Sequence, residues 1–104
     1  MRVELLYFRG CPNDEPTETL VRDVLNELGI YGVVERVEIV DEADARDRCF
    51  VGSPTLRIDG VDIDPDAAAG GYGMKCRLYR DESGQLAGVP PRDLVREALR
   101  QANP

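Results

Sequence analysis

The chain has 104 residues and a formal net charge of −7, from 20 acidic and 13 basic side chains. This length predicts a single domain over residues 1–104. The acidic balance argues against binding to nucleic acid or to an anionic membrane surface, because both need a basic face. The chain has no histidine, which excludes histidine-dependent nucleophilic catalysis and histidine-based zinc sites.

The three cysteines are an odd number in a chain without a recognisable export signal. We therefore expect them to be reduced at rest and not to form a disulfide framework. The apolar run near the amino end is short and contains Glu4, so it does not resemble a signal peptide. No stretch is long enough to span a membrane. These features predict a cytoplasmic protein, and the sequence indicates neither a resident metal ion nor a cofactor.

The first part of the chain alternates strand and helix patterns. Residues Arg2–Phe8 predict a strand that is buried on both faces, since Leu5 and Leu6 are both large. A helix that ends at Gly29 follows, because apolar residues recur there at helical spacing: Leu20, Val21, Val24, Leu25 and Leu28. Residues Val33–Val40 alternate and are rich in β-branched side chains, which predicts a second strand, parallel to the first.

The start of this first helix is open to two interpretations. Pro12 can be the proline of its first turn, with Pro16 as a kink inside the helix. Alternatively, Pro16 takes that place and Cys11 lies in a preceding loop. In either case Cys11 follows a strand and a glycine turn. We expect its thiol to be exposed and close to the amino end of a helix, where a thiolate is favoured.

The middle of the chain predicts a short helix. Residues Asp41–Arg48 contain alanines among charged side chains, and Asp41 is a suitable N-cap. Cys49 lies at the apolar end of this helix beside Phe50. We expect Cys49 to be buried in the core and not to be reactive.

A hairpin and a last helix complete the pattern. Thr55–Ile58 and Val61–Ile63 predict two antiparallel strands, because Asp59–Gly60 between them is a strong turn signal. Lys75–Arg80 can form a short extra strand. Pro90–Pro91 then begins a helix with one apolar face, made of Leu94, Val95, Ala98, Leu99 and Ala102.

This order of elements resembles the thioredoxin-like fold family. Residues Phe8–Pro12 are similar to the active-site turn of that family, and residues Val51–Gly60 are similar to its cis-proline loop and hairpin. The resemblance implies an α/β domain in the order βαβαββα. Its mixed sheet has four strands, or five with the extra strand, and helices flank both faces. The resemblance also implies a cis bond at Pro54 beside Cys11, and pairing of the Ser53 backbone with an extended substrate.

The active-site turn departs from the family pattern at Asp14. Oxidoreductases of the family usually carry Cys-x-x-Cys, and Asp14 stands where the second cysteine would be. A dithiol mechanism within this turn is therefore excluded, whereas a monothiol mechanism through Cys11 stays open. Asp14 can pass a proton to a leaving group, or it can be an acid that stabilises the start of the helix.

A second thiol and a glycine pair complete the candidate site. Cys76 is the candidate within the chain to release a mixed disulfide on Cys11, because a returning fourth strand leads the chain back toward that end. Gly71 and Tyr72 belong to a segment that resembles the glycine pair with which glutaredoxins hold glutathione. The resemblance therefore assigns substrate binding to five residues: Pro12, Ser53, Pro54, Gly71 and Tyr72.

Three functions follow from these residues. The first is thiol–disulfide exchange, or binding of a thiol compound, through Cys11, with a small thiol such as glutathione or a protein as the partner. The second is soft-metal or organomercurial chemistry, since thiolates suit mercury and Cu(I). The set Cys11, Asp14 and Cys76 resembles the residues of organomercurial lyases. The third is a redox-inactive adaptor that keeps the fold without turnover. The sequence leaves open whether the protein is an oxidoreductase and what its oligomeric state is.

Overall fold

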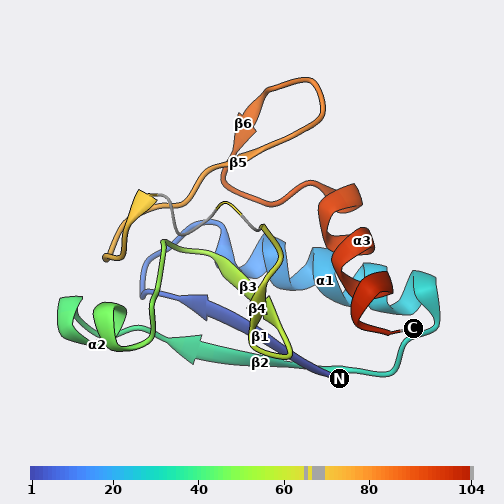
Figure 1. The fold of residues 1–104 in the computed structure, drawn as a ribbon, viewed down its shortest axis with the longest axis horizontal. Helices are drawn as coiled ribbons and strands as arrows, with labels where there is room; N and C mark the ends of the chain where they lie inside the picture. Colours follow the sequence, from blue (N-terminus) through green and yellow to red (C-terminus); the bar gives the residue numbers. More distant parts are fainter. Residues whose placement is uncertain (65, 67–69, 104) are drawn as a thin grey trace.

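A four-stranded mixed sheet with the strand order β2-β1-β3-β4 forms the centre of the protein (Figure 1). The computed structural model describes residues 1–64, 66 and 70–103. The strands are β1 (Arg2–Tyr7), β2 (Val33–Glu38), β3 (Thr55–Ile58) and β4 (Val61–Asp62). The interior strand β1 is parallel to β2 and antiparallel to β3, and β4 is antiparallel to β3. The predictions of an interior first strand, a parallel second strand and a following hairpin are therefore confirmed.

The described residues form three helices, namely α1 (Asp14–Leu28), α2 (Glu42–Asp47) and α3 (Arg92–Ala102). Local signals set their ends. Gly29 ends α1 with a φ of 66°, and the Asp41 carboxylate caps α2 by accepting from the Asp44 N–H at 2.8 Å. Because α1 begins only at Asp14, Pro16 lies in its first turn and Cys11 lies in the preceding loop. None of these helices is long and apolar enough to cross a lipid bilayer.

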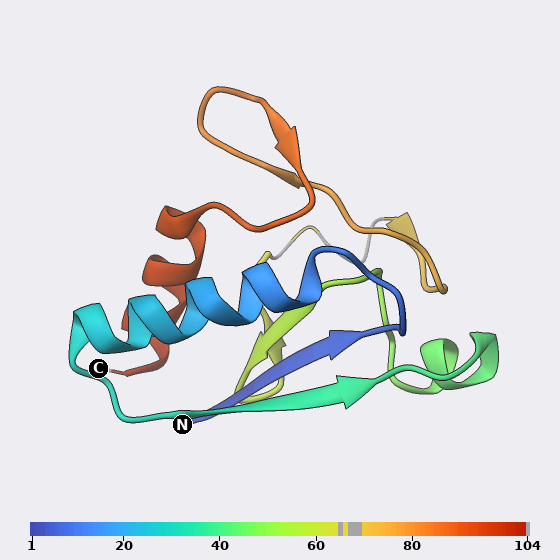
Figure 2. The same cartoon turned by 180° about the vertical axis from the view of Figure 1, so that it is seen from behind.

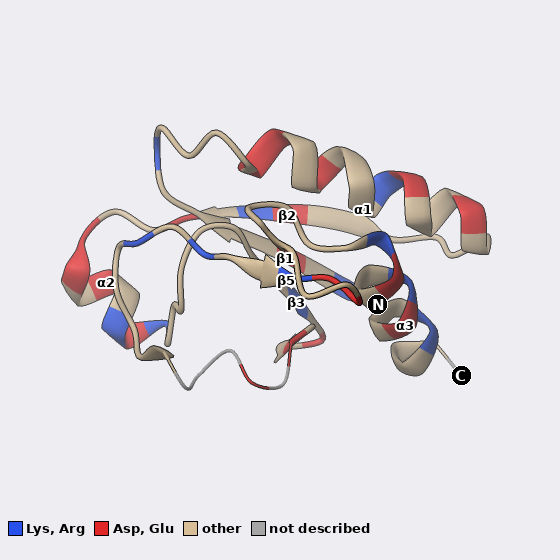
Figure 3. Cartoon of the chain, turned by 90° about the horizontal axis from the view of Figure 1, so that it is seen from above, with Lys and Arg blue, Asp and Glu red and all other residues tan. Residues whose placement is uncertain are grey.

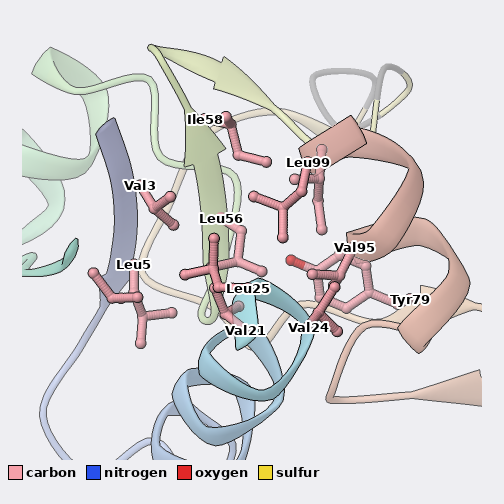
Figure 4. Close-up of a cluster of buried hydrophobic side chains, with 12 residues drawn as sticks. Val3, Leu5, Val21, Val24, Leu25, Leu56, Ile58, Tyr79, Val95 and Leu99 are labelled. Carbon is pink, nitrogen blue, oxygen red and sulfur yellow. The ribbon is translucent and has the colours of Figure 1, made fainter. Parts of the chain in front are cut away.

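The larger hydrophobic cluster lies between the sheet and the helices α1 and α3, which occupy the same face (Figures 1 and 2). Side chains at alternate positions of β1 and β3 point into it, as the two-residue period of a strand requires. Figure 4 shows the cluster, which includes Val3, Leu5, Leu56 and Ile58 of the strands, Val21, Val24 and Leu25 of α1, Val95 and Leu99 of α3, and Tyr79.

A smaller cluster joins the other face of β1 to α2. Leu6 points away from Leu5 and packs with Ile39, Ala45 and Phe50. Both leucines are buried, which confirms the expectation that β1 is covered on two faces. The short helix α2 lies beyond the carboxyl ends of β1 and β2 (Figure 1). It therefore packs near one end of the sheet.

The remaining strands form a separate two-stranded sheet. β5 (Tyr79–Arg80) pairs with β6 (Leu86–Ala87), and this hairpin projects from the body of the protein (Figures 1 and 2). The extra strand predicted over Lys75–Arg80 is thus present only in its last two residues, and it does not join the main sheet. The main sheet therefore has four strands, and β5 and β6 pair only with each other.

Charged side chains of both signs are interspersed along α1 and α3 (Figure 3). Arg96 of α3 donates to Glu27 of α1 at 2.7 Å, and this ion pair joins the two helices across their exposed sides. Hydrogen bonding by Arg96 lowers the pKa of Glu27. These two helices therefore carry a mixed surface and not a basic one.

Candidate functional site

The candidate site lies at the end of the sheet where β1 finishes and β3 starts. Leu6 pairs with Thr55 in the antiparallel ladder, so the residues after Leu6 and those before Thr55 meet at this end. Cys11 lies in the turn after β1, and the Ser53–Pro54 peptide bond directly before β3 is cis. We call this region, defined by Cys11, Ser53 and Pro54, the thiol end.

The chain returns to the thiol end after β4, as the antiparallel hairpin predicts. Cys76 forms an isolated parallel bridge with Ser53. The Ser53 N–H donates to the Lys75 carbonyl at 2.8 Å, and the Arg77 N–H donates to the Ser53 carbonyl at 2.9 Å. We call residues 73–77 the strap. An extended substrate could pair with the Ser53 backbone only by displacing the strap.

Side chains anchor the strap to β3, β4 and the proline loop. Arg77 is only 6% exposed, and both of its terminal nitrogens donate to the Asp62 carboxylate at 2.8 Å. It also donates to the Thr55 hydroxyl at 3.2 Å, and its guanidinium lies 4.4 Å from the centre of the Tyr79 ring. The Tyr79 hydroxyl in turn donates to the Pro54 carbonyl at 2.6 Å. Burial raises the pKa of Tyr79, so its hydroxyl remains a donor at physiological pH.

Gly52 allows the strap to lie close to the start of β3. A Cβ atom at this position would lie 3.0 Å from Cβ of Arg77 and 3.2 Å from the Lys75 carbonyl oxygen. Its φ of 131° is also in a region that favours glycine. Gly52 is therefore required because the strap, which lies more than twenty residues later in the chain, packs directly against it.

The Cys11 thiol is buried, with 7% of the residue exposed, so the prediction of an exposed thiol is wrong. Two later segments reach the thiol end. The strap pairs with Ser53, and Gly88 packs so tightly on Asn13 that any side chain at Gly88 would collide with it. Pro12, which lies between Cys11 and Asn13 in the chain, is exposed. The surroundings of the thiol end are thus made in part by segments that the local sequence around Cys11 does not reveal.

Cys49 is exposed, so the prediction that it is buried in the core is also wrong. The chain turns at this residue with a φ of 55°, and the Cys49 carbonyl accepts from Arg57 at 3.0 Å. This left-handed turn directs the next residue, Phe50, into the smaller hydrophobic cluster. The apolar end of the helix is therefore provided by Phe50, and the thiol is left outside.

Tyr72 lies beside Cys49. Hydrogen bonding to Cys49 is the largest of the causes that raise the pKa of the Tyr72 hydroxyl. Both residues line a surface cavity of about 670 Å³, together with Arg57. Gly71 precedes Tyr72 in an exposed turn and has a φ of 76°. Tyr72 therefore belongs to the neighbourhood of Cys49, whereas the resemblance assigns it to a substrate at Cys11.

Asp14 is part of an ion-pair network between α1 and β2. Its carboxylate accepts from Arg36 at 2.5 Å, and Arg36 also donates to Glu18 at 2.6 Å. The Arg36 guanidinium lies 4.4 Å from the centre of the Tyr7 ring. Hydrogen bonding by Arg36 is the main cause that lowers the pKa of Glu18. This geometry favours the helix-stabilising role of Asp14 over a role in proton transfer.

Two buried hydroxyls have no hydrogen-bond partner among the described residues: Oγ of Ser53 and Oγ1 of Thr17. Buried polar atoms are nearly always paired, so an unpaired one indicates a place for water or a ligand. Ser53 belongs to the thiol end and is fully buried. Its hydroxyl is therefore closed off from solvent, and a bound compound could reach it only if the thiol end opens.

The described part of the chain contains no group of three or more cysteine, aspartate or glutamate residues placed to hold a metal ion. A site made of two cysteines has fewer than three such residues. Two thiolates are enough for a soft ion such as Hg²⁺ or Cu(I). The described residues therefore lack the geometry of a hard-metal site, and a two-sulfur site needs fewer ligands than such a group.

Sequence reasoning missed the anchors of the strap: Asp62, Arg77 and Tyr79. A charged residue is rarely buried, so nothing local marks Arg77 as part of the interior. The structure inverts the usual pattern here, because Leu78 lies between two buried residues and is itself 59% exposed. Such an inverted alternation occurs where a charged side chain finds a buried partner, here Asp62.

Comparison with known proteins gives no match: no protein-family model, no curated protein and no solved structure is significantly similar to this chain. Arguments about function therefore rest on the residues and contacts described above.

Proposed function

We propose that the chain is a thioredoxin-like protein that uses Cys11 for thiol–disulfide exchange or for binding a thiol compound. In this proposal α2 is the helix on the second face of the sheet. The observation that carries the proposal is the Ser53–Cys76 bridge. It brings a second cysteine to the end of the sheet where β1 leads into Cys11.

The proposed chemistry needs two thiols and one disulfide substrate. The Cys11 thiolate attacks one sulfur of the substrate, so that a mixed disulfide forms and the other sulfur leaves as a thiolate. The Cys76 thiolate then attacks the Cys11 sulfur, which releases the rest of the substrate and leaves a Cys11–Cys76 disulfide. Two molecules of an external thiol such as glutathione then reduce that disulfide, leave as their own disulfide and restore both thiols.

Single-turnover reaction with hydroxyethyl disulfide tests this proposal. We expect Cys11→Ser to abolish the reaction at the thiol end and Cys76→Ser to stop it at the mixed disulfide. The matched control Cys49→Ser should react like the unmodified protein, because Cys49 lies beside Tyr72 in a separate cavity. Unchanged release of thiol by Cys11→Ser would overturn the proposal.

A second candidate function is the binding of a soft metal ion by Cys11 and Cys76. The same bridge between Ser53 and Cys76 favours it, because two sulfurs suit Hg²⁺ or Cu(I). Cleavage of an organomercurial is less favoured, since Arg36 engages the Asp14 carboxylate. Titration with Hg²⁺ in the Cys49→Ser background tests this candidate. Equal loss of the site in Cys11→Ser and Cys76→Ser supports it, and binding that survives either change contradicts it.

The adaptor alternative makes a different prediction. A redox-inactive adaptor would bind a partner in the same way whether residue 11 is cysteine or serine. Thiol release that depends on Cys11 would exclude it.

A further inference from the structure

The strap limits the kind of substrate that can reach the thiol end. We infer that this end serves small thiol or disulfide compounds and excludes extended polypeptides, an inference that rests on the function proposed above. Three features carry it: the pairing of the Ser53 backbone, the way the strap is anchored, and the burial of Cys11.

An extended polypeptide is commonly recognised by adding a strand to a free backbone edge. At the thiol end this edge is already occupied. The Ser53 N–H and carbonyl are bonded to Lys75 and Arg77 at 2.8 and 2.9 Å, and Thr55 pairs with Leu6 of β1. The strap therefore takes the position that the backbone of a bound peptide would need.

The strap is anchored to the folded core. Arg77 and Tyr79 are both buried, and Arg77 makes a two-pronged ion pair with Asp62. Moving the strap would separate this pair and expose the Tyr79 ring, and breaking a largely buried ion pair is strongly unfavourable. The contact at Gly52 leaves no space for a second chain between strap and loop. A peptide would therefore have to compete with the native structure itself.

A small compound does not meet this barrier. Only 7% of Cys11 is exposed, which favours a reagent of small cross-section over a polypeptide. Ser53 is fully buried, so its hydroxyl, which has no partner among the described residues, is not presented to solvent. The thiol end thus presents a little-exposed cysteine without a free backbone edge for a longer chain.

Two probes with the same reactive bond test the inference. One is hydroxyethyl disulfide. The other is an extended peptide whose central cysteine carries 2-mercaptoethanol in a mixed disulfide. For each probe we measure the rate of adduct formation at Cys11, and mass spectrometry after digestion assigns the adduct to that residue. This rate is divided by the rate at which the same probe reacts with free glutathione. We expect the peptide to be slower by at least about tenfold, since its reaction requires local opening of the strap.

A variant that loosens the strap provides the second arm. Asp62→Asn weakens the partner of Arg77, so the relative rate of the peptide probe should rise. The matched control Asp93→Asn removes a carboxylate that pairs with Arg96 on α3 and should leave the ratio unchanged. If Asp62→Asn does not fold, the ratio for the unmodified protein still decides. If the peptide reacts as fast as the small probe, the inference is overturned and the proposed function still stands. Failure of both probes to modify Cys11 overturns the proposed function.

Discussion

The surroundings of Cys11 and Cys49 differ in burial, although later segments of the chain reach both residues. Cys11 is buried at an end of the sheet that the strap and Gly88 reach from far along the chain. Cys49 is exposed at a helix end, and its neighbour Tyr72 lies on the surface with it. Cys49 lies at a surface turn, whereas Cys11 lies at the end of the sheet to which the exposed Cys76 returns. In the proposed function the reacting thiol is the buried one, so exposure alone does not identify it.

The largest expected effect is the loss of Arg77, which anchors the strap at the Cys11 side. We expect Arg77→Ala to lower the free energy of unfolding by about 3 to 5 kcal/mol, because it leaves a largely buried partner without its ion pair. Urea denaturation at neutral pH measures this loss. The matched control is Arg57→Ala at the Cys49 side, where Arg57 donates to the carbonyls of Arg48 and Cys49. It should cost only about 1 kcal/mol. Equal losses would contradict the distinction between the two regions.

Leu6 lies in the cluster that both regions share. Leu6→Ala should lower the free energy of unfolding by about 2 to 4 kcal/mol, as is usual for a large-to-small change in a core. The cluster joins β1 to Ala45 and Phe50 near Cys49. Met74 of the strap packs against the same cluster, so the change should also loosen the strap and speed alkylation of Cys11 by a bulky maleimide. A loss below about half the lower figure would show that the buried faces of β1 are assigned wrongly.

Tyr79 links the strap to the proline loop through one hydroxyl. Tyr79→Phe removes the hydrogen bond to the Pro54 carbonyl and should cost about 1 kcal/mol. Access to Cys11 should increase while access to Cys49 stays the same, since Tyr79 holds the chain after the strap against the proline loop. Maleimide labelling followed by mass spectrometry measures both thiols in one sample. A change at Cys49 alone would argue against the described role of Tyr79.

The Asp14 network predicts a pH dependence of stability. Arg36 lowers the pKa of Glu18 in the folded protein, so the pair contributes stability above the ordinary glutamate pKa of 4.5 and loses it as the pH falls through the lowered value. In Arg36→Ala this acid-dependent loss should shrink, and stability at neutral pH should fall by about 1 kcal/mol. Urea denaturation from neutral to acidic pH measures both. An unchanged acid dependence would contradict the assignment.

Much of the fold was predictable because its signals are local. The Asp59–Gly60 turn and the Asp41 cap each lie within the element that they define, and both were predicted correctly. The exposure of Cys11 and Cys49 was not predictable in this way. The partner of Ser53 is Cys76, which lies more than twenty residues later. No pattern in the sequence near Cys11 predicts this pairing.

The central claim is that Cys11 and Cys76 form one functional pair at the thiol end. Mild oxidation at low protein concentration, followed by digestion and mass spectrometry, tests it most directly. A disulfide requires that the two Cα atoms come within about 7 Å. We predict a Cys11–Cys76 link with Cys49 remaining as a free thiol. A Cys11–Cys49 link, or only intermolecular disulfides of Cys11, would contradict the account and make external glutathione the better candidate for the second thiol.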